Sequence, residues 1–243
     1  FEPQLWQQAD ASFRHWAFIR ESLEELDATL RAIGGKLIVR CGPIVSVLTQ
    51  LQRELGPFEL RSHEETGNAW TFARDREVMR WCREHGIPWD EYPTNGVVRR
   101  LRERDGWAAA RNAVMTAAQR PTPTMIRFAA STSEPLPAAN TAPFNRIEGR
   151  VQQGGRRDGL KVLRSFLSSR SRDYMRSISK PGVSARHCSR LSAHLAYGTL
   201  SAREVDQAAA LRMRELDESN DPSSAYWSRQ IAAFRARLAW RCH

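Results

Sequence analysis

The residues best suited to chemistry lie in one short segment, Cys188 to Ser201, in the second half of the chain. It carries hydroxyl groups at Ser189 and Ser192 and a guanidinium group at Arg190, all within one predicted helical turn. Free backbone amides, hydroxyl groups and the positive end of the helix dipole together bind phosphate at a helix start. The segment therefore predicts a pyrophosphate site. An ordinary helix with Ser189 as its N-cap fits the same spacing.

A second group of candidates lies on a helix predicted over 222–241. Arg237 and Arg241 place positive charge along this helix, and Trp240 offers a flat ring on which a nucleic acid base can stack. The alternative is a solvated arginine face with Trp240 in the core. These residues are candidates for binding nucleic acid.

The first half of the chain alternates predicted helices with extended segments. Apolar spacing and glycine stops predict helices over 12–33, 42–56 and 70–85. Extended segments are predicted at 36–40, from residue 58, and over 87–92. This alternation is typical of a parallel sheet with helices on its faces, so we expect a Rossmann-like α/β domain. Because the chain starts with a helix, we expect the first strand of that sheet to be missing.

The second half is predicted to be entirely helical. A proline-rich stretch of low periodicity predicts an interdomain linker over 120–150, between an α/β domain over 1–119 and a helical domain over 151–243. Further helices are predicted around 160–167 and over 189–197, 202–216 and 222–241. Ser201 and Glu204 have the spacing of a capping box at the start of one of them.

Composition narrows the class of protein. The 37 lysines and arginines exceed the 27 acidic residues, and a net charge of +10 indicates a polyanionic partner, although a basic solvated face is the alternative. The four cysteines form no CxxC pair, so neither a metal site nor a disulfide framework is expected. No apolar run approaches the ~18 residues of a membrane span. We therefore expect a cytoplasmic protein without membrane contact.

Several segments resemble the DNA photolyase/cryptochrome family. Cys188 to Ser201 resembles its TSRLSPYLAxGxLS signature, and Phe166 to Tyr174 resembles its FLxxRxxxY segment. Trp240-Arg241 falls where the family has a Trp-Arg pair. In the first half, the family's second strand is resembled by Ile38 to Pro43, and its third helix by Arg74-Asp75. A family branch has a HEETGN-like motif, which is similar to His63 to Asn68. These segments favour a photolyase-like branch.

The resemblance implies the cofactor, the site and the partner. It implies that FAD is bound, with an antenna pigment left unspecified, and that the partner of a monomeric protein is damaged DNA. The implied cofactor residues are Tyr174, Cys188, Ser189, Arg190, Leu191, Ser192 and Arg241. The implied contacts with DNA or its lesion are Arg237, Trp240 and Arg241.

The implied activity is light-driven splitting of pyrimidine dimers by electron transfer from reduced FAD, as in deoxyribodipyrimidine photo-lyases. A cryptochrome-like blue-light photoreceptor and a non-catalytic nucleic-acid binder are the alternatives. Two family hallmarks are absent: the W-x-R-x-D-L-R strand at the start, and the Asn and Asp residues that grip the flavin ring at the end. We therefore expect a helical domain that is truncated and inactive by itself, and no catalytic residue is assigned.

Overall fold

The computed structural model describes residues 1–103, 105–138 and 151–242. Their contacts group into two compact units. Within the described residues, unit 1 consists of 1–94, 122–138 and 151–154, and unit 2 consists of 95–103, 105–121 and 155–242. The domain boundaries at 119 and 150 stay predictions, because contact groups do not say which part folds independently.

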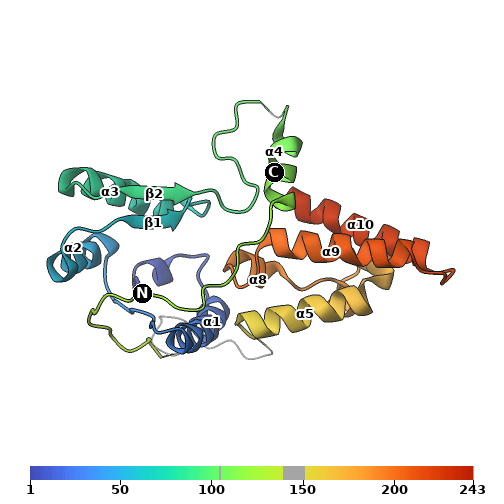
Figure 1. Ribbon diagram of the computed structural model, residues 1–243, viewed down its shortest axis with the longest axis horizontal. Helices are drawn as coiled ribbons and strands as arrows, with labels where there is room; N and C mark the ends of the chain where they lie inside the picture. The colour runs from blue at the N-terminus through green and yellow to red at the C-terminus, as the bar shows by residue number, and fades with distance from the viewer. Residues whose placement is uncertain (104, 139–150, 243) are drawn as a thin grey trace. The chain divides into compact units, whose positions relative to one another are not determined.

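In its described residues, unit 1 combines three α-helices and a short 3₁₀ helix with a small parallel sheet (Figure 1). The two strands pair in parallel, with Leu60 opposite Trp89 and His63 opposite Tyr92. The helices predicted from apolar spacing are confirmed, with ends that differ by one or two residues. The elements are η1 (Leu5–Gln7), α1 (Phe13–Ala32), α2 (Ile44–Leu55), β1 (Leu60–His63), α3 (Ala69–His85) and β2 (Trp89–Tyr92).

Side chains and glycines at the helix ends explain these bounds. Ser12 caps α1 by accepting a hydrogen bond from the amide of His15, and Asn68 caps α3 by accepting one from the amide of Thr71 at 3.0 Å. Gly86 ends α3 in the left-handed conformation, with φ of 65°. A residue with a side chain is strained there, so glycine provides the stop.

The strand predicted over Lys36–Arg40 is not present, and this prediction was wrong. The segment is extended, but the neighbouring residues Ser133 and Glu134 accept its backbone hydrogen bonds mostly with their side chains. The amide of Val39 donates to Ser133 Oγ and that of Cys41 to Glu134 Oε1, both at 2.9 Å, whereas only the amide of Glu134 returns a backbone bond, to the carbonyl of Val39. Without a regular backbone ladder the segment does not join the sheet.

In its described residues, unit 2 contains helices joined by turns and loops, and no strand (Figure 1). The capping box predicted at Ser201 is confirmed: Glu204 N donates to Ser201 Oγ at 3.1 Å, and Ser201 N donates to Glu204 Oε2 at 2.9 Å. The elements are α4 (Trp107–Thr116), α5 (Arg156–Ser168), η2 (Arg170–Asp173), α6 (Tyr174–Ser177), α7 (Pro181–His187), α8 (Ser192–Ala196), α9 (Ala202–Asp217) and α10 (Ser224–Trp240).

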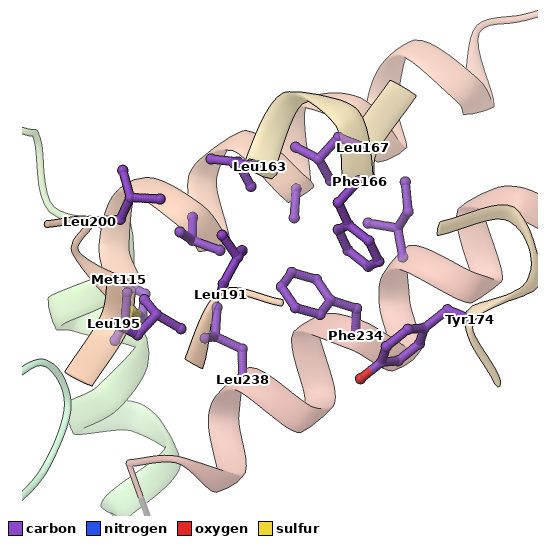
Figure 2. Close-up of a cluster of buried hydrophobic side chains, with 14 of the residues drawn as sticks. Met115, Leu163, Phe166, Leu167, Tyr174, Leu191, Leu195, Leu200, Phe234 and Leu238 are labelled. Atoms are coloured by element: carbon purple, nitrogen blue, oxygen red, sulfur yellow. The ribbon is translucent and has the colours of Figure 1, made fainter. Parts of the chain in front are cut away.

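One continuous apolar core holds unit 2 together (Figure 2). Phe166 from α5 is fully buried, and its ring meets the edges of Tyr174 and Phe234 at centroid distances of 5.7 and 4.7 Å. Val205 of α9 and Ile231 of α10 are also fully buried. Full burial of such a side chain contributes about 1.5–3 kcal/mol, so this packing fixes the helices that carry the candidate site.

The segment predicted as a linker contains no helix or strand in its described part, 120–138. The remainder of the predicted linker, 139–150, lies outside the described residues. Within the described parts of the chain, no helix has the length and apolar character needed to cross a membrane.

Candidate functional site

The predicted phosphate segment is a turn followed by a short helix. The helix predicted from Ser189 begins only at Ser192, because Arg190 adopts a left-handed backbone conformation with φ of 59°. Ser189 is therefore not the N-cap, and its Oγ instead accepts from the amide of Leu191 at 3.4 Å. Since α8 has only five residues, its dipole is small. Phosphate binding here rests on hydroxyl and guanidinium groups.

The residues of this turn differ in exposure. Arg190 and Ser192 are exposed, and Cys188 and Ser189 are half-buried. Leu191 is 1% exposed and packs in the core, which leaves only its backbone for a ligand. Burial raises the pKa of the Cys188 thiol, and the positive charge of Arg170 opposes this change. Cys188 is therefore a neutral lining group.

Two arginines fix the turn and α8 through backbone carbonyls. Arg170 donates from Nη1 to the carbonyl of Cys188 and from Nη2 to that of Ser189 at 3.3 Å. Arg241 donates from Nη2 to the carbonyl of Leu195, at the other end of α8, at 2.8 Å. Sequence reasoning missed Arg170, although it is the arginine of the FLxxRxxxY segment. Arg241 was predicted to contact cofactor or DNA, and the described contact is with this carbonyl.

Tyr174 lies at the edge of the core with its ring buried (Figure 2). Burial raises the pKa of its hydroxyl group, the proximity of Cys188 raises it further, and Arg237 opposes both effects. Cys188 and Arg237, both predicted for the site and distant in sequence, thus lie close enough to Tyr174 to change the pKa of its hydroxyl group. The hydroxyl group stays protonated at neutral pH and can donate a hydrogen bond.

Trp240 is exposed rather than part of the core. Its residue is 64% exposed on α10, and the guanidinium carbon of Arg237 lies 4.0 Å from its ring centroid. Trp240, Trp107, Ala236 and Ala239 line an open hollow of about 570 Å³. Trp107, whose Nε1 donates to the carbonyl of Cys242 at 3.0 Å, was not identified from the sequence. This surface offers stacking faces beside a cation.

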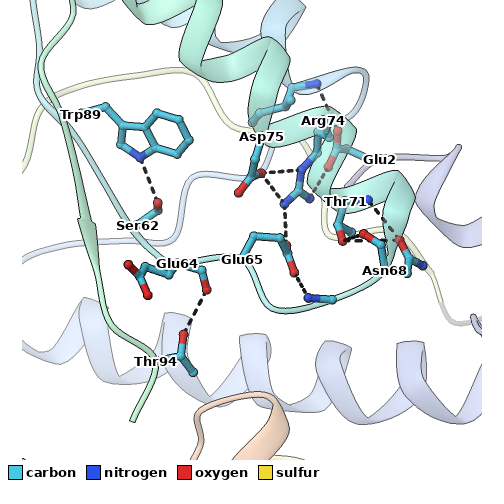
Figure 3. A network of polar contacts seen from close by, with 12 residues as sticks. Glu2, Ser62, Glu64, Glu65, Asn68, Thr71, Arg74, Asp75, Trp89 and Thr94 are labelled. Atoms are coloured by element: carbon cyan, nitrogen blue, oxygen red, sulfur yellow. Dashed lines mark hydrogen bonds and ion pairs between the residues drawn. The ribbon is translucent and has the colours of Figure 1, made fainter. Parts of the chain in front are cut away.

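A polar network in unit 1 surrounds Arg74 (Figure 3). Its guanidinium group pairs with Glu2 and Glu65 at 3.1 Å and with Asp75 at 3.0 Å. Burial acts to lower the pKa of Arg74, but the carboxylates of Asp75 and Glu2 outweigh burial and raise the pKa. Because Arg74 of α3 pairs with Glu2 as well as Glu65, the network ties the chain start to α3.

The described residues contain no group of three His, Cys, Asp or Glu side chains placed to hold a metal ion. The four cysteines are free thiols, with Cys41 exposed and Cys82 and Cys242 buried.

Comparison with known proteins gives a family match for the first part of the chain and a likeness in fold for most of it. Residues 1–103 match the family model of DNA photolyase. No curated protein matches the sequence. A cryptochrome from Synechocystis sp. PCC6803 is similar in structure, with a TM-score of 0.70 and 20% identity over 99% of this chain and 53% of that one.

Two photolyases are also similar. A bacterial class III photolyase from Agrobacterium tumefaciens has a TM-score of 0.70 and 18% identity, over 96% of this chain and 50% of that one. An archaeal photolyase from Sulfolobus tokodaii, solved with two FAD molecules, has a TM-score of 0.54 and 23% identity, over 92% of this chain and 49% of that one. The chain thus spans about half the length of these structures and shares their fold.

Proposed function

We propose that this chain, whose residues 1–103 match the family model of DNA photolyase, is part of a flavin-dependent, light-driven DNA repair protein. Its substrate is a pyrimidine dimer in DNA, and its reaction class is carbon–carbon lyase. The observation that carries the proposal is the turn at 188–192, which offers hydroxyl groups and an exposed arginine near the buried ring of Tyr174.

The donor set of this turn has the chemistry that FAD requires. Ser189 and Ser192 supply hydroxyl donors, and the exposed guanidinium of Arg190 supplies charge for a pyrophosphate. Tyr174 supplies an apolar ring face with a protonated hydroxyl group for the planar part of the ligand. FAD, when bound, supplies the light absorption and the electron that split the dimer. The chain's own residues bind and orient it.

The DNA side of the proposal rests on α10. Trp240 presents an exposed ring on which a flipped base can stack, and Arg237 adds positive charge against that ring. Arg241 holds α8 through the carbonyl of Leu195 and so links the two candidate surfaces. The excess of arginine and lysine over acidic residues supports binding to the phosphate backbone.

A blue-light photoreceptor is the second candidate. The chain is similar in fold to the Synechocystis cryptochrome, with the same TM-score as for the class III photolyase. The fold therefore favours the photoreceptor and the repair enzyme equally. The two candidates share the cofactor and differ in the event that light absorption triggers. Repair splits a lesion, whereas signalling changes the conformation of the protein without consuming a substrate.

The test starts from the visible absorption spectrum of the purified protein and from titration with FAD. We expect binding that weakens by about tenfold in Ser192→Ala, the loss of one hydrogen bond to a charged group. The matched control is Ser179→Ala, an exposed serine outside the turn, which should bind as the unchanged protein does. Absence of FAD binding in the longer protein that contains this chain would refute the proposal.

A second measurement separates repair from signalling. DNA containing a pyrimidine dimer is incubated with the reduced, flavin-loaded protein in blue light and in darkness. Dimer loss only in the light supports repair. Light-dependent change in protease sensitivity with the dimer intact supports the photoreceptor instead.

A further inference from the structure

Arg170 makes an unusual set of contacts for an arginine in unit 2. Its hydrogen-bond partners are three backbone carbonyls and one hydroxyl group. Nη2 donates to the carbonyl of Val162 at 2.8 Å and to that of Ser189 at 3.3 Å, Nε donates to Ser165 Oγ at 3.0 Å, and Nη1 donates to the carbonyl of Cys188. The guanidinium thus joins α5 to the turn.

These contacts act on a turn with an uncommon backbone conformation. The turn contains Arg190 in a left-handed conformation, which costs about 1 kcal/mol or more for a residue with a side chain. Ser189 Oγ makes one long bond of 3.4 Å within the turn. Leu191 anchors its far end in the core. At its near end the amide of Cys188 donates to the carbonyl of Ser184 at 2.8 Å, and Arg170 adds the side-chain contacts that join this end to α5.

We propose that Arg170 is the positioning residue of the candidate site: by holding the carbonyls of Cys188 and Ser189 against α5, it keeps the Ser189–Ser192 turn in the shape that receives the pyrophosphate of a dinucleotide. The ligand in this inference rests on the proposed function. Its mechanical part, that Arg170 holds the turn against α5, does not. A planar fork with donors on three nitrogens bridges several carbonyls at once, which a lysine ammonium on a flexible stem does less well.

The mechanical part is tested by amide hydrogen exchange of the turn in Arg170→Met, in the full chain without ligand. We expect exchange of residues 188–195 to rise by about tenfold, the effect of losing one charged hydrogen bond, while α9 keeps the exchange of the unchanged protein. Retained protection of α9 shows that the unit is still folded. Unchanged exchange over 188–195 would overturn the proposal.

Labelling of Cys188 with a maleimide gives an independent measurement. Because Arg170 lowers the pKa of this thiol, removing its charge alone slows labelling. Opening of the turn speeds labelling, so faster reaction of Cys188 in Arg170→Met supports release of the turn. Slower reaction would mean that charge alone was lost, and would overturn the proposal. Exposed Cys41, in unit 1, is the internal control.

Two further variants separate geometry from charge. Arg170→Lys keeps the charge but loses the fork, so exchange of the turn should lie between that of Arg170→Met and the unchanged protein. Arg164→Met is the matched control, because Arg164 is an exposed arginine on α5 whose Nε donates to Leu160, one turn earlier. Exchange in Arg164→Met as fast as in Arg170→Met would contradict the proposal.

Titration with FAD tests the ligand part. If the unchanged protein binds FAD, Arg170→Met should bind it at least about tenfold more weakly, and Arg164→Met should bind it normally. Equal affinity of Arg170→Met and the unchanged protein would overturn the positioning role. If neither this chain nor the longer protein that contains it binds FAD, the proposed function fails, while hydrogen exchange still decides whether Arg170 holds the turn.

Discussion

Unit 1 and unit 2 are stabilised by different kinds of contact. Unit 2 has one continuous apolar core to which α4, α5, α9 and α10 contribute. In unit 1 the buried apolar residues form two smaller clusters, around Trp81 and around Trp6 and Trp16, and other apolar side chains line an open cavity of about 610 Å³. Ion pairs around Arg74 connect its segments instead.

The difference shows how each unit positions its functional groups. Close packing leaves little room for movement, so the buried helices of unit 2 can hold an exposed turn and an exposed tryptophan in fixed places. Ion pairs with partly exposed partners contribute less to the free energy of unfolding and depend on salt. We therefore expect apolar truncations to affect unit 2 most, and charge removal to affect unit 1 most.

The largest expected effect comes from opening the core of unit 2. Phe166→Ala removes a fully buried ring that contacts Tyr174 and Phe234 and should lower the free energy of unfolding of unit 2 by about 3–5 kcal/mol. Denaturant unfolding measures it. Phe72→Ala is the control, because Phe72 is 50% exposed on α3. Similar losses in the two variants would show that the core is not what distinguishes the units.

Removal of Arg74 tests the polar side of the comparison. Arg74→Met leaves the carboxylates of Glu2, Glu65 and Asp75 without their shared cation. The free energy of unfolding of unit 1 should fall by about 2 kcal/mol, a value between those for exposed and for fully buried ion pairs. Added salt should make this loss smaller. Arg61→Met, which breaks the exposed pair with Glu59, should change the melting temperature little. If salt does not change the stability loss in Arg74→Met, repulsion among the three carboxylates is not its cause.

Acid should weaken unit 2 through a buried histidine. Burial lowers the pKa of His194, and Asp158 opposes this change. Unfolding therefore takes up a proton between the unfolded value near 6.5 and the lower folded value. Stability should fall as the pH drops below about 6.5, by at most about 1.4 kcal/mol per pH unit, and this slope should decrease in His194→Gln. Urea unfolding from pH 7 to 5 measures it; an unchanged slope would point to another group.

The smallest expected effect comes from removing a helix N-cap, which compares α9 in unit 2 with α3 in unit 1. Ser201→Ala removes the side-chain cap of α9 and should cost about 1 kcal/mol, whereas Ser201→Gly should cost only a few tenths. Asn68→Ala removes the corresponding cap of α3 in unit 1. Thermal unfolding compares the three variants. If Ser201→Gly costs as much as Ser201→Ala, the contribution comes from another contact of the serine.

Local patterns predicted the helices well. Apolar residues at three- and four-residue spacing predicted α1, α2, α3, α9 and α10, and caps and glycines predicted their ends. These signals are local, so they survive without knowledge of the neighbours. The short elements η2, α6 and α7 were not predicted, since each is too brief for a periodic pattern.

The errors occurred where distant segments decide the backbone. Lys36–Arg40 has the composition of a strand, but its partners at Ser133 and Glu134 offer side chains instead of a regular ladder. The helix predicted from Ser189 begins three residues later, since Arg190 takes a left-handed conformation beside the carbonyls that Arg170 holds. The spacing of residues within each segment does not reveal these distant partners.

The sequence by itself determined the helices, the family resemblance and the residue types available for a phosphate and a base, because periodicity, caps and motifs are properties of consecutive residues. Only the tertiary structure decided that Cys188 and Arg237 lie near Tyr174, that Trp240 is exposed beside Arg237, and that Arg170 donates to the carbonyls of the turn. Such contacts join residues distant along the chain, and burial, which sets their strength, exists only after the helices have packed.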